Sequence, residues 1–324
     1  MRLLPLPPSG RARFAPRRWW LIMPVIFVTY SLACLDRVNF GFAAAGGMAA
    51  DLGLTSEMSS LIGSFFLVGY FAFQNPGAIY AQRHSVKKLI FACMFVWGVC
   101  ATVTGLLSDV GSLLVVRFLL GAAEAAILPA ILIFVSRWFT RAERSRANTL
   151  LILGNPTTML WMSVLSGYLV DAFGWRWMFI LEGFPTVIWA FCWWAIVRER
   201  PDDATWLLPE EKADLARRLA AEQAGLPVVR DYRAALRSRV VLLLAAQYFF
   251  WSFAFFGFVL WLPSILKQSS TIGIVQTGWL AALPYLLAIV AMVLVSQVSD
   301  RRQDRRGVDG TDHPCRAPGA GARP

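Results

Sequence analysis

The chain has 324 residues, of which 57% are hydrophobic, 14% aromatic and only 16% charged. Because soluble domains usually carry about 25% charged residues, this composition excludes an ordinary soluble protein and indicates a polytopic membrane protein. The formal net charge of +11 could suggest a nucleic-acid partner. No zinc-ligand spacing, basic groove motif or recognition-helix pattern accompanies that charge, so we expect no nucleic-acid binding.

Residues suited to catalysis or metal binding are scarce. His84 and His313 both fall outside the apolar segments and are not paired. The sequence contains no GxSxG, HExxH, Walker or GxGxxG motif. Its five cysteines, four of them in apolar segments, imply no disulfide framework. We therefore expect neither an enzyme nor a protein that holds a cofactor or metal.

Residues 1–18 are rich in proline and arginine and predict a disordered cytoplasmic tail, with a cleaved signal peptide as the alternative. After this tail come apolar segments of roughly the 20 residues that a membrane-crossing helix needs. The eight predicted helices are 19–45, 58–80, 88–107, 112–136, 147–170, 177–197, 240–266 and 277–299.

Lysine and arginine are concentrated in every second connection, and these connections lie on one side of the predicted bundle. All but four of the 31 basic residues lie in the N-terminal tail or in the connections after the second, fourth, sixth and eighth helices. The exceptions are Arg176 and Lys267 in the opposite connections and Arg37 and Arg117 inside helices. The positive-inside rule therefore predicts two cytoplasmic termini.

The longest polar connection, 198–239, divides six helices (19–197) from the last two (240–299), and residues 300–324 read as an unstructured cytoplasmic tail. Within the connection, Pro209-Glu210-Glu211 signals a helix start and Gly225 its end, which predicts a surface helix. AQRHSVKK (81–88) resembles SDRRQDRR (299–306) at an offset of 218 residues. Parallel repeats of this kind are a signature of secondary transporters.

Four charged residues interrupt the apolar segments. Asp36 and Arg37 are adjacent in the first helix, and Arg117 and Glu124 lie in the fourth. An ionised side chain near the bilayer centre costs about 3 kcal/mol on insertion scales, so such residues indicate a transport pathway. Seven residues place Arg117 about 10 Å from Glu124 along one helix face, so each needs a partner elsewhere, for which Asp36 and Arg37 are the candidates. A purely structural ion pair is the alternative.

These residues lie in motifs that resemble the major facilitator superfamily, and within it the anion:cation symporter family of organic-acid permeases. The resemblance extends from about residue 18 to residue 306. The motifs that carry it are YSLACLDRVNFGFA (30–43), RFLLGAAEAAILPA (117–130), RWFTRAERSRA (137–147), GWRWMFILEGFP (174–185), PDDATWLLPEEK (201–212), WLPSIL (261–266) and SDRRQDRR (299–306).

The resemblance implies a helical bundle with a complete six-helix N-terminal half and about two helices of a second half. It also implies that Arg37 binds the substrate carboxylate, helped by Tyr70 and Asn155. Asp36 and Glu124 would bind the coupling protons, with Arg117 modulating them. Residues of the gating loops would be Arg83, Lys87, Asp300, Arg301 and Arg305.

The sequence departs from the family at three places. Cys34 stands where the family usually has tyrosine, and His84 and Ser85 replace a glycine in the loop after the second helix, where they could stiffen the gating turn. After residue 306 no further apolar run follows. We interpret this end as a truncation by frameshift or premature stop, with a genuine eight-helix protein as the alternative.

We therefore expect a proton-coupled symporter of an organic anion, such as a sugar acid, tartrate or an aromatic acid, impaired by truncation. It would be a monomer surrounded by lipid in the bacterial inner membrane. The alternative is a non-transporting membrane protein that binds or senses a ligand, or an inactive fragment.

Overall fold

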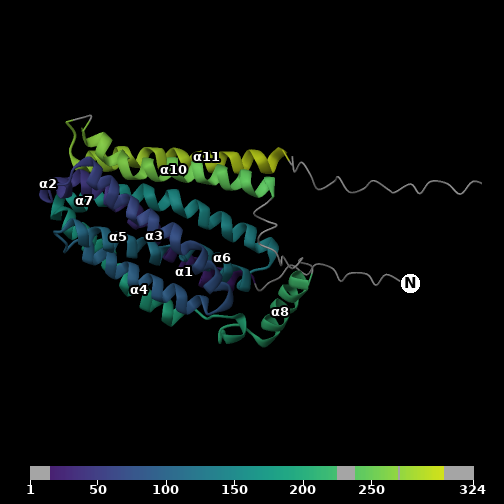
Figure 1. Cartoon of the computed structure of the whole chain (residues 1–324). Coiled ribbons are helices and arrows are strands. Elements are labelled where there is room, and N and C mark those ends of the chain that lie inside the picture. Colours follow the sequence, from purple (N-terminus) through teal and green to yellow (C-terminus); the bar gives the residue numbers. More distant parts are fainter. Residues whose placement is uncertain (1–14, 225–237, 269–270, 303–324) are drawn as a thin grey trace, which may run out of the picture.

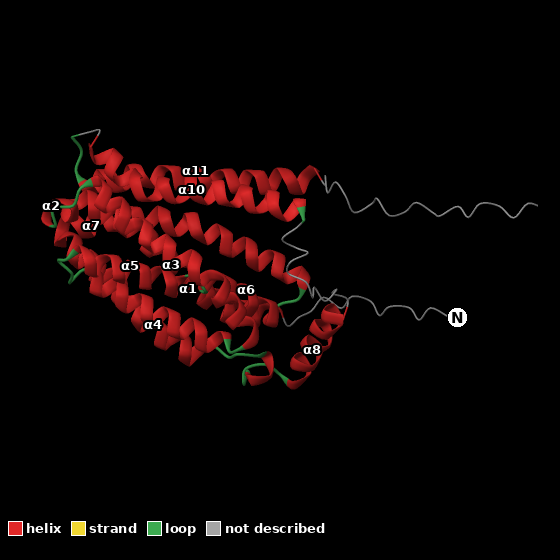
Figure 2. Ribbon diagram, viewed as in Figure 1, coloured by secondary structure: helices red, strands yellow, loops and turns green. Residues whose placement is uncertain are grey.

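The computed structural model describes residues 15–224, 238–268 and 271–302, and the regular structure of these residues is entirely helical (Figures 1 and 2). The predicted fold class, an all-helical membrane bundle, is confirmed. In chain order the elements are α1 (Ala15–Ala43), a π-helical turn η1 (Ala44–Met48), α2 (Ala49–Asp51), α3 (Ser56–Arg83), α4 (Val86–Thr104), α5 (Val110–Glu124), α6 (Ile127–Trp138), α7 (Arg141–Ile196), a 3-10 turn η2 (Pro201–Asp203), α8 (Pro209–Ala224), α10 (Arg239–Gln268) and α11 (Ile274–Arg302).

Seven helical segments of the described chain are long and apolar enough to cross a membrane. The longest, α7, has 56 residues and would extend about 84 Å if it were straight, far beyond the roughly 30 Å hydrocarbon core. It bends at Gly174, whose φ of 81° lies in the region that favours glycine. The predicted helices 147–170 and 177–197 lie on the two sides of this bend, so α7 accounts for two of the eight predicted helices.

The span Val110–Trp138 contains α5 and α6. Regular helix is interrupted between them at Ala125 and Ala126, directly after Glu124. Pro129 follows, and a proline has no N–H to donate to the carbonyl four residues earlier, which is that of Ala125. The break therefore has a local cause, and it places Glu124 at the end of a helix rather than within one.

Helix boundaries differ slightly from those predicted. The helix α1 begins at Ala15, four residues before the predicted start, and α11 continues to Arg302, into the predicted tail. The predicted surface helix is present as α8, at the end of the bundle where α6 ends (Figure 1). Residues 1–14, 225–237 and 303–324, which include most of both predicted tails and part of the predicted connection, lie outside the described residues.

The helices α10 and α11 run side by side along one edge of the bundle (Figure 1). The helix α11 packs against α7, and α10 packs mainly against α1. Residues 240–251 of α10 are all exposed, whereas Ser252, Val259 and Pro263 are buried. The helix α10 therefore meets the rest of the bundle mainly through its second half.

Small residues allow close approach of helix backbones, as is usual in membrane bundles. A Cβ atom added at Gly121 of α5 would collide with the Phe66 carbonyl of α3. Likewise, Gly278 of α11 lies against the Ser163 carbonyl of α7. The contact at Gly121 is the one that brings α5, with its two charged residues, against α3.

This contact predicts the effect of a single methyl group. We expect Gly121→Ala to destabilise the protein by about 1–3 kcal/mol, because two backbones must separate to admit the Cβ. A lower melting temperature of the purified protein in detergent would show this. The matched control is Gly257→Ala in α10, where a Cβ meets open space and no loss is expected. Equal melting temperatures for the two variants would contradict the packing argument.

Candidate functional site

The four charged residues predicted inside the membrane are all buried. Asp36, Arg117 and Glu124 are 2%, 3% and 1% exposed, and the Arg37 side chain is 9% exposed. None of them faces the lipid side of its helix. Since burial of a charge is costly without a partner, the positions of their neighbours decide what they can do.

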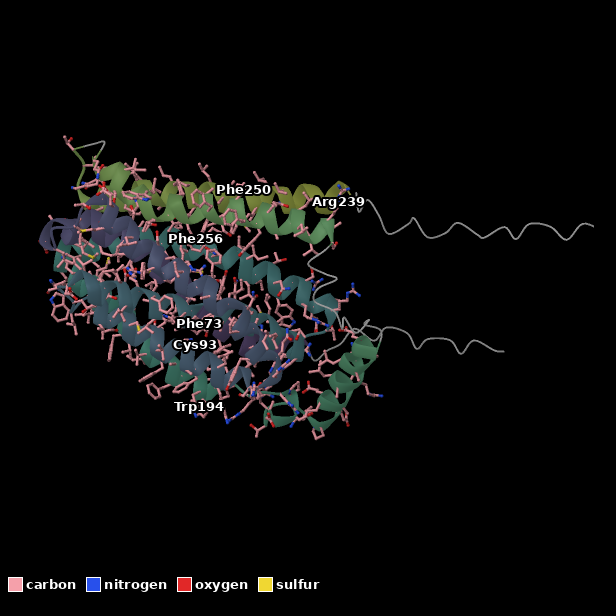
Figure 3. All side chains as sticks on the ribbon, in the orientation of Figure 1. Phe73, Cys93, Trp194, Arg239, Phe250 and Phe256 are labelled. Atoms are coloured by element: carbon pink, nitrogen blue, oxygen red, sulfur yellow. The ribbon has the colours of Figure 1, made fainter. Side chains whose placement is uncertain are left out.

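Arg37 and Glu124 form an ion pair between α1 and α5. The Arg37 guanidinium donates to Glu124 Oε1 from Nε, at 2.7 Å, and from Nη2. Two aromatic rings flank the same guanidinium, Tyr70 at 5.5 Å and Phe256 at 5.9 Å from the ring centres. Figure 3 shows Phe256 on α10, so this cation is in contact with three helices besides its own. The other oxygen of Glu124, Oε2, is buried without a hydrogen-bond partner in the described structure.

Asp36 takes no part in that pair, although it adjoins Arg37 in the sequence. Neighbouring side chains on a helix point about 100° apart, and Asp36 instead accepts a hydrogen bond from Asn39 Nδ2 at 2.9 Å. Asn39 is itself buried. The two adjacent charged side chains therefore point to different sides of α1 and have different partners.

Arg117 lies over the ring of Phe40, 4.2 Å from its centre, and 5.6 Å from that of Phe179. Its Nε and Nη2 atoms are buried without a hydrogen-bond partner among the described residues. The expected outside partner is thus found for Glu124, which pairs with Arg37. Arg117 contacts two aromatic faces and is within electrostatic reach of Asp36 and Glu124, but it forms no ion pair among the described residues.

A pocket brings three of the charged residues together. Asp36, Arg37 and Arg117 line it, and apolar side chains from α1, α3 and α10 complete its wall: Phe40, Phe66, Leu67, Phe256 and Leu260. The charged residues thus meet a small space between helices rather than packed protein on all sides. Such a concave site, with a few polar groups among apolar ones, is the usual form of a small-ligand site.

The two further residues predicted to bind substrate lie differently. Tyr70 is buried beside the Arg37 guanidinium, as a contributor to that site should be. Asn155 of α7 lies next to Tyr30 of α1, and Tyr30 in turn interacts electrostatically with Arg37 and Tyr70. The structure therefore places Tyr70 against the Arg37 guanidinium and links Asn155 to the same site through Tyr30.

Sequence reasoning missed several neighbours of this site. Phe256 and Asn39 carry no signal in the sequence, because an aromatic residue or an amide in an apolar helix is common. Glu182 does carry one. It is a carboxyl in the apolar run of GWRWMFILEGFP, the same signal that singled out Glu124, and it is 3% exposed.

A second polar cluster lies at the end of the bundle where α3 meets α4, where gating residues were predicted. Glu199 accepts hydrogen bonds from the Ser85 hydroxyl at 2.7 Å and from the backbone N–H groups of Val86 at 3.1 Å and Lys87 at 2.9 Å. It also pairs with Arg137 of α6. Burial raises the pKa of Glu199, but the Ser85 hydroxyl, these backbone donors and Arg137 outweigh it, so the pKa is lowered.

This cluster explains the departure at Ser85. Its hydroxyl caps the start of α4, accepting from Lys88 N–H at 3.1 Å, and His84 stacks on Tyr80. Arg83 is the last residue of α3, and the Lys87 ammonium lies 4.8 Å from the ring centre of Trp194. Asp300 and Arg301 belong to α11, but the described structure does not include their side chains, and Arg305 lies outside the described residues.

The family model described as Major Facilitator Superfamily matches residues 26–308. The chain belongs to this superfamily. It is therefore a multi-pass membrane protein of a transporter family rather than an enzyme, and the predicted membership is confirmed.

Two similar proteins are named as transporters of different compounds. A putative tartrate transporter of Agrobacterium vitis is 33% identical over 301 residues, covering 91% of this chain and 67% of the relative. A quinolone resistance transporter of Acinetobacter baumannii is 29% identical over 294 residues, covering 88% of this chain and 68% of the relative. This chain thus spans about two thirds of the length of these relatives.

A solved structure supports the fold. The bacterial homologue of the human lysosomal transporter Spinster, in an inward-facing and unoccupied conformation, matches with a TM-score of 0.68 and 19% identity. The match covers 89% of this chain and 63% of that structure.

The Glu199 cluster leads to a prediction about stability and pH. Because the folded pKa of Glu199 is lowered, its contribution is present above the ordinary carboxyl value of 4.5 and is lost as the pH falls through the folded value. We expect Glu199→Gln to melt at a lower temperature than the unmodified protein at pH 7, and to lose less further stability on acidification to about pH 4. Thermal unfolding in detergent at both pH values measures this.

The control for that experiment is Glu210→Gln, a substitution at an exposed position at the start of α8. It should leave both melting temperatures near those of the unmodified protein. If Glu199→Gln behaves like this control, the cluster does not stabilise the junction of α3, α4 and α6.

Proposed function

We propose that this chain is a proton-coupled symporter of a small organic anion, with the substrate carboxylate held by Arg37. The observation that carries the proposal is the buried Arg37–Glu124 pair beside the pocket. A guanidinium binds a carboxylate through two parallel N–H donors. Both Arg37 donors bind one oxygen of Glu124, Oε1. A substrate carboxylate could replace Glu124 as the acceptor of these two hydrogen bonds.

Protonation of Glu124 would control that replacement. A neutral carboxyl no longer balances the charge of Arg37, so the guanidinium is left without a counterion in a buried site. An arriving anion restores the balance. Proton binding and anion binding therefore favour each other, which is the thermodynamic requirement for symport.

Asp36 and Arg117 would modify the binding of the anion at the pocket. Both line the pocket, and Arg117 has buried N–H donors without partners. A proton on Asp36 removes a negative charge close to the incoming anion. Arg117 would then hold positive charge at the pocket whether or not Arg37 is occupied.

The remaining predictions form part of this proposal. Both termini would be cytoplasmic, as the alternation of basic residues suggests, with Arg83, Lys87, Asp300, Arg301 and Arg305 at the cytoplasmic gate. Residues 19–197 would form one rocking half, and 240–299 would belong to the other. The protein would act as a monomer in the bacterial inner membrane, in contact with lipid.

Tartrate is our first candidate substrate, because one relative is named for it and because guanidinium groups prefer carboxylates. The test uses purified protein in liposomes with an acidic exterior. We expect saturable accumulation of labelled tartrate, a hexuronate or an aromatic carboxylate that collapses when a protonophore dissipates the gradient. Binding without accumulation would instead indicate a non-transporting binding protein.

Removal of Arg37 should abolish anion binding at every pH. We expect Arg37→Ala to weaken binding at least about 30-fold, since loss of one partner of a buried charge pair costs about 2–5 kcal/mol. Isothermal titration with the transported anion measures the affinity. Because this variant leaves Glu124 unpaired, the double variant Arg37→Met with Glu124→Gln serves as a second test of the same loss. Retained affinity in both would place the carboxylate elsewhere.

Replacement of Glu124 should separate exchange from coupling. Glutamine keeps the shape of Glu124 but cannot bind or release a proton. In Glu124→Gln we expect anion exchange across the liposome membrane to continue, while accumulation driven by a pH gradient is lost. The control is Asp171→Asn, at an exposed carboxyl of α7. If gradient-driven accumulation survives in Glu124→Gln, another group carries the proton.

A further inference from the structure

A third buried carboxyl, Glu182, lies in the second half of α7 and has no part in the Arg37–Glu124 pair. Its Oε1 accepts a hydrogen bond from the Ser166 hydroxyl, at 2.7 Å, across the two antiparallel halves of α7. Its Oε2 is buried without a hydrogen-bond partner in the described chain. An ionised carboxylate in this position would be poorly satisfied, since one oxygen meets a hydroxyl and the other meets nothing.

The polar neighbours of Glu182 come from α1 and from the first half of α7. Asn39 of α1 lies beside it and also donates to Asp36. Arg117 of α5 reaches the ring of Phe179, which precedes Glu182 by three residues on the same helix. In the part of the chain that the structure describes, no lysine or arginine forms an ion pair with Glu182.

Asp36 shares Asn39 with Glu182 and is within electrostatic reach of it. A negative charge on one of these two carboxyls therefore disfavours a negative charge on the other.

Charge balance then constrains the protonation of the cluster. Three acidic residues (Asp36, Glu124 and Glu182) and two basic ones (Arg37 and Arg117) are buried in the middle of the described bundle. With all five ionised, the cluster carries a net charge of −1 in a medium where an uncompensated charge is costly. One bound proton makes it neutral. Glu124 faces Arg37 and Asp36 shares the pocket with Arg117, whereas Glu182 accepts its hydrogen bond from the neutral Ser166 hydroxyl and pairs with no cation among the described residues.

We propose that Glu182 is a further proton-binding residue, which carries a proton while Asp36 and Glu124 are ionised and so keeps the buried site neutral before an anion arrives. Loss of this proton from the carboxyl O–H to water leaves a carboxylate beside Asp36 and makes the site repel anions. The part that concerns anions rests on the proposed function, whereas the proton occupancy does not.

Infrared spectroscopy tests the proton occupancy without any substrate. We expect purified protein at neutral pH to show the carbonyl stretch of a buried, protonated carboxyl, and this band to disappear in Glu182→Gln. That substitution keeps the size of the side chain and an acceptor for Ser166. Glu57→Gln, at an exposed position of α3, should retain the band. An unchanged band in Glu182→Gln overturns the proposal.

If Glu182→Gln does not fold, the proton occupancy of the buried cluster can still be measured in the unmodified protein. Alkaline titration of the unmodified protein should then convert a protonated-carboxyl band into a carboxylate band. The absence of any such band at neutral pH would also overturn the proposal.

Anion exchange tests whether loss of the Glu182 proton makes the site repel anions. We expect exchange by the unmodified protein to fail at alkaline pH, and the alkaline limit to move upward by about one pH unit or more in Glu182→Gln, where the site cannot gain the extra charge. A purely structural Glu182 would leave the limit unchanged. If the unmodified protein shows no anion exchange at any pH, the proposed function fails, while the infrared result still decides the protonation of Glu182.

Discussion

The pairing of Arg37 with Glu124 is the interaction on which the architecture of the site depends. It joins α1 to α5 through a guanidinium and a carboxylate that the membrane would otherwise exclude. Removal of one partner from a buried pair leaves an uncompensated charge, so the pair is stable only as long as both remain or something replaces one of them. The packing around it serves this arrangement. Gly121 brings α5 against α3, and Phe256 brings α10 over the guanidinium.

A pair of this kind can switch because its strength depends on a single proton. When Glu124 is ionised, both donors of Arg37 are taken and the site closes on itself. When it is neutral, the guanidinium needs an external anion. In our proposal Asp36 and Glu182, with Asn39 between them, extend this logic to a second pair of acidic groups. The buried cluster holds three acidic residues and two basic ones, so one bound proton would make it neutral.

Much of this could be predicted from the sequence, for physical reasons that differ between features. Segment length and hydropathy predict the membrane helices, because a bilayer of fixed thickness imposes them. The spacing of Arg117 and Glu124 predicts that Glu124 needs a partner on another helix, and Arg37 is that partner. Contacts between helices could not be predicted. The aromatic faces over Arg117 and the approach of Phe256 depend on how helices rotate and cross. Glu182 carried a usable signal, a carboxyl in an apolar run, but its role emerges only from its neighbours.

The central claim is that proton binding and anion binding favour each other at one buried site. The most direct measurement is the proton balance of anion binding, followed with a pH indicator as tartrate, or whichever anion proves to bind, is added to purified protein in weakly buffered detergent. Our account predicts that protons are taken up from solution in proportion to the anion bound, and that this uptake is absent in Glu124→Gln. Saturable anion binding with no change in pH, or with release of protons, would contradict it.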